Sequence, residues 1–356
     1  MKQLNITEHE AGQRLDRLLA KVFSQAGKGF LYKMLRKKNI VLNGKRAEGN
    51  EALKAGDVIS VYFSDETYEK LSSSTPSQSA VLYGAEKTGG AKQTENAKNA
   101  GEVSRQKKHI RKQVPQVVYE DKHVLILHKP AGMLSQKAEA EDDSLVDYVQ
   151  DYLLKTGCLS EERLRTFRPG ICNRLDRNTE GLVIAGKTIL GLQTMSELLR
   201  SRKLDKYYLC VVKGTVERPM RLKGYLVKDE TRNQVTVGNG PEGEPIETEY
   251  YPIAATNAGT LLEVKLITGK SHQIRAHLAS AGHPIAGDMK YGDVEYNRRM
   301  KERFGVRHQM LVAYRMVFPN LPEEFSGLSE KEVKTVLPAV FEHFCRAYQI
   351  EELRNV

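Results

Sequence analysis

The chain has 356 residues, which exceeds the common size of one domain and predicts two folded units joined by a linker. Its formal net charge of +10 and its isoelectric point near 9.2 indicate a polyanionic partner, because lysines and arginines that neutralise phosphates release condensed counterions. No apolar run approaches the roughly 20 residues of a membrane-spanning helix and the four cysteines form no paired ligand motif, so we expect a cytoplasmic protein without membrane contact, disulfides or a zinc site.

Residues 13–65 are expected to form a small α+β unit. Two stretches have apolar residues at helical spacing, and the second begins near Lys28. The apolar positions of these two predicted helices are Leu15, Leu18, Leu19 and Val22, then Phe30, Leu31, Met34 and Leu35. The segment 40–45 is typical of a strand followed by a turn, and residues 58–62 predict a closing strand.

This small unit is strongly basic. Between residues 13 and 46 there are ten basic residues and one acid, Asp16, a density that exceeds that of an ordinary solvated face. The pattern Arg14-Leu15-Asp16-Arg17, the basic helix and Val41–Lys45 followed by Gly56-Asp57 resemble the S-four-like RNA-binding domain, which grips RNA backbone and shape. A basic helical hairpin of unrelated fold is the alternative. The residues expected to contact RNA are Arg14, Arg17, Lys28, Lys33, Arg36, Lys37, Lys38 and Lys45.

Residues 66–114 are expected to form a flexible linker. From residue 72 onward the composition shifts to Ser, Gly, Lys, Gln, Asn and Ala with almost no large apolar residues, and such a segment cannot bury enough surface to offset chain ordering. The basic run 105–112 at its end either contacts phosphates nonspecifically or is solvated.

Residues 115–325 have the pattern of a larger α+β domain with a mixed, mainly antiparallel sheet and flanking helices. Apolar runs predict strands over 124–127, 182–185, 207–212, 248–255, 261–267 and 312–318. Helical spacing predicts helices over 191–200 and 271–281. Variable strand spacing and a hairpin turn at 238–243 argue against a doubly wound parallel sheet. Residues 326–356 are expected to form a helical extension.

The strongest local signal for chemistry is the segment Gly170–Ile184, where a polar cluster precedes an apolar strand. Within it Asp176 lies between Leu175 and Arg177, with Arg174 two residues before it, and nearby cations favour an ionised carboxylate. Taken alone, Asp176 is a candidate nucleophile, general base or ion-pair anchor. A structural salt bridge with the flanking arginines is the default interpretation of this pattern.

Four blocks follow one another along the second domain. They are His128-Lys129-Pro130-Ala131-Gly132, Arg174-Leu175-Asp176-Arg177-Asn178-Thr179-Glu180-Gly181, Lys206–Gly214, and Gly269–Leu278 continuing into Gly282–Asp288 and Tyr291-Gly292. In this order they resemble the RluA-type pseudouridine synthases. The tetrad Arg-Leu-Asp-Arg alone is not diagnostic, because it also occurs at Arg14–Arg17 without the following Thr-x-Gly.

The resemblance implies a role for several residues. Asp176 is then the catalytic carboxylate, Tyr208 packs against the target base and Arg275 pairs with Asp176. Arg174 enters the space that the extruded base leaves. Without the resemblance, Tyr208 is better explained by core packing and Arg275 by a contact with an RNA phosphate. One departure is Asn173, where many family members have His. Asn forms hydrogen bonds but does not titrate near neutral pH, and we expect it to alter RNA fit or loop geometry.

No metal, cofactor or nucleotide is expected. The run Thr268–Ser271 ends like a phosphate-binding loop, but that motif needs a glycine where Val264 lies within a predicted strand. The spacing of His272, His277 and His283 matches no known metal site, so hydrogen-bonded structural histidines are the better interpretation.

The expected function is isomerisation of specific uridines in structured RNA, with large-subunit ribosomal RNA as the first candidate substrate. Transfer RNA is the alternative substrate. Two other hypotheses remain open at this stage: an RNA-binding factor of ribosome assembly without catalysis, and a nucleoside-cleaving enzyme. The modified uridine and the oligomeric state are not determined by the sequence.

Overall fold

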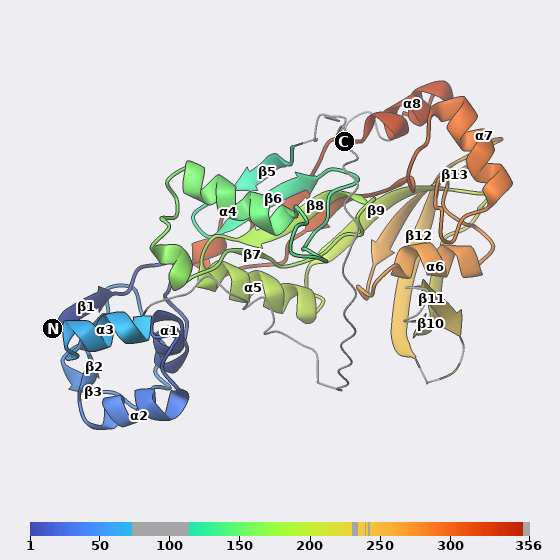
Figure 1. Cartoon of the computed structure of the whole chain (residues 1–356). Coiled ribbons are helices and arrows are strands. Elements are labelled where there is room, and N and C mark those ends of the chain that lie inside the picture. The colour runs from blue at the N-terminus through green and yellow to red at the C-terminus, as the bar shows by residue number, and fades with distance from the viewer. Residues whose placement is uncertain (73–113, 230–233, 239, 241–242, 352–356) are drawn as a thin grey trace, which may run out of the picture.

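The computed structural model describes residues 1–72, 114–229, 234–238, 240 and 243–351. Figure 1 shows a small N-terminal module beside a larger domain that is built on one extended sheet. Of the predicted linker 66–114, residues 73–113, which include the basic run 105–112, lie outside the described residues. Within the described part of the chain, no helix is long and apolar enough to cross a membrane.

The N-terminal module packs helices against a four-stranded sheet with strand order β1-β4-β2-β3. Its elements are β1 (Lys2–Asn5), α1 (Leu15–Val22), α2 (Lys28–Arg36), β2 (Ile40–Leu42), β3 (Lys45–Arg46), β4 (Val58–Val61) and α3 (Asp65–Ser72). The two predicted helices and the predicted strands are present. The expected bounds 13 and 65 are too narrow, because β1 pairs with β4 and α3 continues the chain into the segment predicted as linker.

The large domain has an eleven-stranded sheet, mainly antiparallel as predicted. Its strands are β5 (Gln116–Glu120), β6 (Val124–Lys129), β7 (Gly170–Ile171), β8 (Glu180–Gly186), β9 (Asp205–Val212), β10 (Met220–Asp229), β11 (Gln234–Gly238), β12 (Glu244–Thr256), β13 (Gly259–Leu266), β14 (Leu311–Val317) and β15 (Glu332–Lys334). The order is β11-β10-β12-β13-β9-β14-β8-β6-β5, with β7 on β8 and β15 on β14. Among the described strands only β14 and β8 pair in parallel, so the sheet is not doubly wound.

Helices cover both faces of this sheet (Figure 1). They are α4 (Leu145–Lys155), α5 (Ile189–Arg200), α6 (Gln273–Ser280), α7 (Val294–Phe304) and α8 (Ala339–Ala347). Because successive strand residues point to opposite faces, Tyr208 and Cys210 of β9 join the core under α4 and α6, whereas Leu209 and Val211 join the core under α7 and α8. Burial on both faces explains why the central strands are continuous apolar runs.

The C-terminal segment is part of the large domain, so the predicted helical extension over 326–356 is only partly correct. Strand β15 pairs with β14, and Phe341 and Phe344 of α8 are fully buried in the same core as α7. The sequence gives a weak strand signal there, since β15 has three residues and two of them are charged.

The N-terminal module contacts the large domain through the segment before α1 and through α1 itself. Thr166 donates a hydrogen bond from its hydroxyl to Glu10 at 2.7 Å, and Lys21 donates to the Thr166 carbonyl at 2.9 Å. The His9 and Phe167 rings stack with centroids 6.2 Å apart. These contacts fix the basic module against the domain that carries the predicted catalytic residues.

Candidate active site

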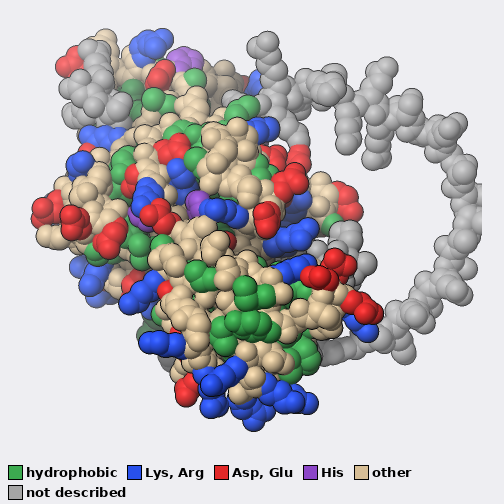
Figure 2. All heavy atoms as spheres, turned by 90° about the vertical axis from the view of Figure 1, so that its left-hand side faces the viewer, with side chains coloured by type: hydrophobic (Ala, Val, Ile, Leu, Met, Phe, Trp, Pro, Cys, Tyr) green, Lys and Arg blue, Asp and Glu red, His purple; other side chains and the backbone are tan. Residues whose placement is uncertain are grey.

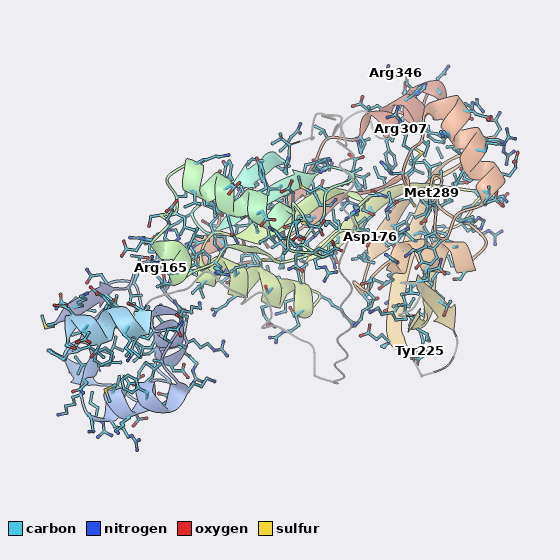
Figure 3. All side chains as sticks on the ribbon, viewed as in Figure 1. Arg165, Asp176, Tyr225, Met289, Arg307 and Arg346 are labelled. Atoms are coloured by element: carbon cyan, nitrogen blue, oxygen red, sulfur yellow. The ribbon has the colours of Figure 1, made fainter. Side chains whose placement is uncertain are left out.

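Asp176 lies in the loop between β7 and β8, near the middle of the large domain (Figure 3). The backbone around it is tied down on both sides. Ser135 accepts a hydrogen bond from the Leu175 amide at 3.0 Å and donates its own hydroxyl to the Leu175 carbonyl at 2.7 Å. On the other side, the Gly132 amide donates to the Arg177 carbonyl at 2.8 Å. The loop therefore presents Asp176 in one conformation.

Lys129, from the first of the four blocks, supports the same loop from inside the core. Its fully buried ammonium donates to the carbonyls of Pro130, Met133 and Arg177 at 3.0, 2.9 and 3.1 Å. Burial lowers the pKa of Lys129 to about 8. A buried ammonium needs such acceptors, so the side chain joins the turn after β6 to the loop that carries Asp176.

Gly181 makes the close approach of β8 to β14 possible. Its φ is +115°, and a Cβ there would lie 2.2 Å from the Ala313 carbonyl oxygen. Any side chain would push the two parallel strands apart. The glycine that follows the Asp176 loop is therefore required by packing.

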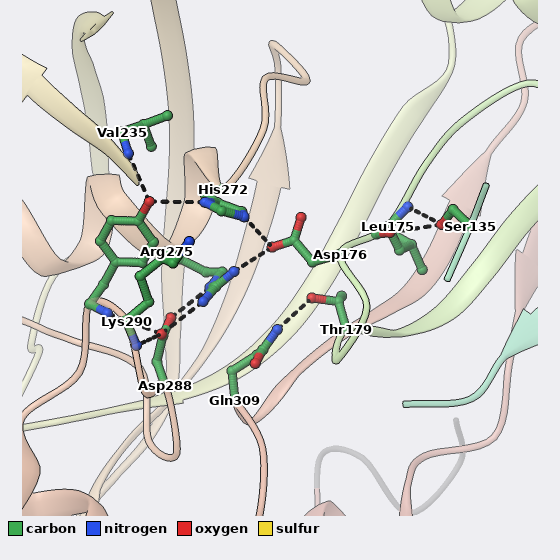
Figure 4. A network of polar contacts seen from close by, with 11 residues as sticks. Ser135, Leu175, Asp176, Thr179, Val235, His272, Arg275, Asp288, Lys290 and Gln309 are labelled. Atoms are coloured by element: carbon green, nitrogen blue, oxygen red, sulfur yellow. Dashed lines mark hydrogen bonds and ion pairs between the residues drawn. The ribbon is translucent and has the colours of Figure 1, made fainter. Parts of the chain in front are cut away.

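Arg275 pairs with Asp176, as the resemblance implied. It lies in the first turn of α6, and its Nη1 donates to Asp176 Oδ2 at 2.7 Å (Figure 4). Neither of the flanking arginines, Arg174 and Arg177, contacts the Asp176 carboxylate within the described part of the chain. The default salt bridge with sequence neighbours is thus wrong, and the cation comes from a residue 99 positions away.

A second carboxylate holds the other side of the Arg275 guanidinium. Asp288 accepts from Nε at 2.7 Å and from Nη2 at 2.9 Å, and its side chain is fully buried. Although burial alone would raise the pKa of Asp288, the contacts with Arg275 and with the backbone amides of Lys290 and Tyr291 hold it below its ordinary value. For Arg275, burial acts to lower the pKa but the contacts with Asp288 and Asp176 raise it. The guanidinium is therefore charged and fixed between two carboxylates.

The Asp176 carboxylate is only partly enclosed. Its side chain is 26% exposed, whereas that of Arg275 is 9% exposed. Both close contacts of Asp176, with Arg275 and with His272 Nε2 at 3.9 Å, involve Oδ2. Oδ1 has no hydrogen bond or ion pair with any described residue, and in Figure 4 no dashed line reaches it. One carboxylate oxygen is thus held and the other is available.

Tyr208 lies on the sheet face that α4 and α6 cover, and it belongs to the main core. Burial and, secondly, the negative charge of Asp176 raise the pKa of Tyr208. Its phenol is therefore neutral, and its hydroxyl has no hydrogen-bond partner among the described residues. Tyr208 is thus part of the core and also lies near Asp176. Its interpretation as a core residue therefore does not exclude its interpretation as a residue that packs against the target base.

Asn173 and Arg174 precede Asp176 in the loop between β7 and β8. Arg174 is exposed and forms no ion pair with the described residues. Asn173 instead bonds to β8: its Nδ2 donates to the Leu182 carbonyl at 3.2 Å and its Oδ1 accepts from the Ile184 amide at 2.8 Å. Asn173 therefore ties the loop before Asp176 to β8.

The three histidines that were expected to be structural all have hydrogen-bond partners. Nδ1 of His277 lies 3.0 Å from the Thr248 hydroxyl, and Nδ1 of His283 lies 3.1 Å from the Lys213 carbonyl. Nδ1 of His272 lies 2.9 Å from the hydroxyl of Tyr291. Among the described residues, no group of three or more His, Cys, Asp or Glu could hold a metal ion. His272 differs from the other two because its ring also faces Asp176.

The predicted RNA-contacting residues of the N-terminal module lie on its surface. All eight, namely Arg14, Arg17, Lys28, Lys33, Arg36, Lys37, Lys38 and Lys45, are exposed. Figure 2 shows lysine and arginine side chains gathered at the lower end of the face that carries this module. Arg14 is engaged in an ion pair with Asp16 at 2.9 Å. This surface lies apart from Asp176, which belongs to the large domain.

Sequence reasoning assigned no role at the catalytic site to three residues that surround Arg275 in the structure: Asp288, Tyr291 and His272. The Arg275 guanidinium lies over the Tyr291 ring, 5.2 Å from its centroid. Asp288 and Tyr291 stand in the last part of the fourth block, so their inclusion in that pattern was the only available signal. Their contacts with α6 depend on how the loop after this helix folds back.

Comparison with known proteins gives a consistent result. Residues 123–280 match the family described as RNA pseudouridylate synthase. Ribosomal large subunit pseudouridine synthase C of Escherichia coli strain K12 is 30% identical over 314 residues, which are 85% of this chain and 83% of that protein. The protein of the same name from Pasteurella multocida is 28% identical over 356 residues, which are 96% of this chain and 94% of that protein. The solved structure of human RNA pseudouridylate synthase domain containing 4 shares the fold, with a TM-score of 0.52, 20% identity and coverage of 66% of this chain and 93% of its own.

Proposed function

The chain belongs to the RNA pseudouridylate synthase family, and we propose that it converts specific uridines of large-subunit ribosomal RNA to pseudouridine with Asp176 as the catalytic carboxylate. The observation that carries this proposal is the arrangement at Asp176. One oxygen is fixed by a buried arginine at 2.7 Å, and the other is free to meet a substrate. The names of the relatives support ribosomal RNA as the substrate.

The reaction moves the bond between the sugar and uracil from nitrogen 1 to carbon 5 of the same base. Nothing is oxidised, reduced or added, so a carboxylate and a closed pocket are sufficient in principle. Arg275 holds Oδ2 of Asp176 at 2.7 Å, so the carboxylate has a fixed position for the first step, whether it acts on the base, the anomeric carbon or a sugar proton. Tyr208 supplies an aromatic wall with a neutral hydroxyl against which detached uracil can turn.

A paired or stacked uridine has to leave the RNA before it can reach Asp176. Extrusion costs a few kcal/mol, and the cost is lowest for bases in loops. Arg174 is exposed, unpaired among the described residues and two positions before Asp176, so it can fill the space that the base leaves. Contacts between RNA phosphates and the exposed cations of the N-terminal module offset the remaining cost.

Replacement of Asp176 by asparagine tests the catalytic role. Pseudouridine should no longer form in large-subunit ribosomal RNA transcribed in vitro. Its presence or absence is measured by chemical mapping, in which pseudouridine reacts with carbodiimide and stops primer extension. The melting temperature and the RNA affinity should stay near those of the wild type. The matched control is Asp151→Asn, which changes an exposed carboxylate on α4 and should leave the activity intact.

The same assay separates the alternatives. Activity on transfer RNA but not on ribosomal RNA would replace the proposed substrate. Release of free uracil without pseudouridine would indicate a nucleoside-cleaving enzyme, and RNA binding without either product would indicate a non-catalytic factor. Retained activity in Asp176→Asn would refute the assignment of the carboxylate.

The role of the N-terminal module has its own test. The double variant Lys33→Glu/Arg36→Glu reverses two exposed charges of α2. If both residues contact phosphates, the slope of log affinity against log salt should become shallower by about 1.5–2. A matched variant, Arg299→Glu/Lys301→Glu on exposed positions of α7, should bind RNA as the wild type does. Equal losses in the two variants would show that net charge alone is responsible.

A further inference from the structure

His272 has a strained backbone, and its side chain lies between Tyr291 and Asp176. It is the residue before α6, and its φ of +55° lies in the left-handed region that residues other than glycine rarely adopt. Strain of this kind persists only where the surroundings hold the residue in place, and it often occurs at functional sites. The surroundings of His272 are Tyr291 on one side of the imidazole and Asp176 on the other.

The hydrogen bonds of Tyr291 determine which imidazole nitrogen carries the proton. The Tyr291 oxygen accepts a hydrogen bond from the Val235 amide at 3.0 Å, and it lies 2.9 Å from Nδ1 of His272 (Figure 4). A phenol has one proton to donate, and Nδ1 is the acceptor in reach. When Tyr291 donates to Nδ1, the proton of the neutral imidazole is on Nε2, the nitrogen that faces Asp176 Oδ2 at 3.9 Å.

Charges around the ring are consistent with a neutral imidazole. Burial lowers the pKa of His272, and the positive charges of Arg275 and Lys290 act in the same direction. Asp176 and Asp288 act in the opposite direction, but the pKa remains below its ordinary value. The Nε2 proton is then present at neutral pH without a positive charge that would compete with Arg275 for the carboxylate.

A single loop holds both side chains that face the catalytic carboxylate. Asp288 binds the Arg275 guanidinium, and Tyr291, three residues later, binds His272 and lies under the same guanidinium. The loop is rigid because Asp288 accepts hydrogen bonds from the Lys290 and Tyr291 amides at 2.9 and 3.1 Å. Arg275 and His272 therefore approach the same oxygen, Oδ2, from two fixed directions.

We infer that His272 is a positioning residue for Asp176 in the proposed reaction: as a neutral imidazole oriented by Tyr291, it directs its Nε2 proton toward Oδ2, so that Oδ1 is the oxygen presented to the uridine. The inference rests on the proposed function of Asp176. The distance of 3.9 Å is too long for a hydrogen bond, and contacts of this type shorten when a substrate closes the site. A single contact from Arg275 leaves the carboxylate some freedom to turn about its bond to Cβ, and a second donor that reaches Oδ2 from another direction restricts this motion.

Three variants test the inference by single-turnover kinetics on the ribosomal RNA transcript. His272→Gly suits the left-handed backbone but removes the donor, and it should lower the rate constant by about 10- to 100-fold at unchanged RNA affinity. His272→Gln restores a donor that cannot titrate, and it should recover most of this loss. Tyr291→Phe keeps the ring but not the hydroxyl, and it should give an intermediate rate. The matched control His283→Gln changes a histidine bonded to the Lys213 carbonyl and should react at the wild-type rate.

Nitrogen NMR of the imidazole gives a readout that does not depend on activity. His272, assigned with the His272→Gln variant, should show an unprotonated Nδ1 and a protonated Nε2, and the Nε2 signal should shift in Asp176→Asn. An Nδ1-protonated tautomer, a wild-type rate in His272→Gly, or a failure of His272→Gln to recover activity would overturn the inference. If this tautomer is observed but the wild type forms no pseudouridine in the transcript, the proposed function fails and the orientation of the carboxylate by His272 stands.

Discussion

Replacement of Asp288 by asparagine should destabilise the large domain by about 3 kcal/mol, although Asp288 does not face the substrate. The Asp288 side chain is fully buried and binds Arg275 through two hydrogen bonds of 2.7 and 2.9 Å. Removal of one partner from a buried ion pair costs about 3–5 kcal/mol, because the remaining charge stays desolvated. The lower end applies because Arg275 keeps its contact with Asp176 and because asparagine can still accept from the backbone amides that follow.

Thermal unfolding without RNA measures this effect. For a domain of this size, 1 kcal/mol shifts the melting temperature by about 2–4 °C, so the variant should melt about 6–12 °C below the wild type at pH 7. The matched control is Glu295→Gln, which removes the carboxylate from an exposed pair with Arg298 and should leave the melting temperature unchanged.

The difference between Asp288→Asn and the wild type should depend on pH in a defined way. The pKa of Asp288 in the folded chain is below its ordinary value, so its carboxylate contributes stability that is fully present above the pKa of the unfolded chain. This contribution is lost as pH falls through the folded pKa, whereas asparagine does not titrate. The stability difference should therefore be constant above about pH 5 and shrink below about pH 4.

Two results would refute this reasoning about Asp288. One is a melting temperature of Asp288→Asn within about 2 °C of the wild type, which would mean that Asp176 and water replace the lost partner of Arg275. The other is a stability difference that persists unchanged into strong acid, which would mean that the ionised carboxylate is not the source of the effect.

Three further substitutions follow from the packing around the site. Lys129→Met leaves buried carbonyls without their donor, so the free energy of unfolding measured by chemical denaturation should fall by about 2–4 kcal/mol. Activity should be lower at unchanged RNA affinity, and a stability equal to that of the wild type would contradict the role of the ammonium. Gly181→Ala forces a Cβ against β14 and should lower the free energy of unfolding by about 2–6 kcal/mol. At Gly132 the φ is also positive but the space is open, so Gly132→Ala should lower it by only about 1–2 kcal/mol. Similar losses in the two variants would show that packing is not the cause. Thr166→Val removes the hydrogen bond to Glu10 and should increase hydrogen exchange in α1 by about 10-fold without a change in the large domain; unchanged exchange would mean that this bond does not hold the module.

Much of the fold could be predicted from the sequence, because most helices and central strands have a recognisable local pattern of apolar residues. Helical spacing in α1, α2 and α5 and continuous apolar runs in β6, β8 and β9 required no tertiary information. Elements whose signal is weak were not predicted. Strand β15 has three residues with two charges, and β1 lies outside the expected bounds of the small unit because only its pairing with β4 places it there. Short strands of this kind are stabilised by their neighbours and not by their own composition.

The sequence by itself selected Asp176, Tyr208 and Arg275 as the candidate site residues, since the four ordered blocks contain them whatever their arrangement in space. It did not determine their partners: the neighbouring arginines do not bind Asp176, and the buried cation that does comes from α6. Only the tertiary structure decided that Oδ2 is held, that Oδ1 is open, and that Asp288 and Tyr291 fix the two groups facing the carboxylate. The physical reason is that hydrogen bonds and ion pairs depend on distances of 3–4 Å between side chains, and the fold brings these residues together across about 100 positions of sequence.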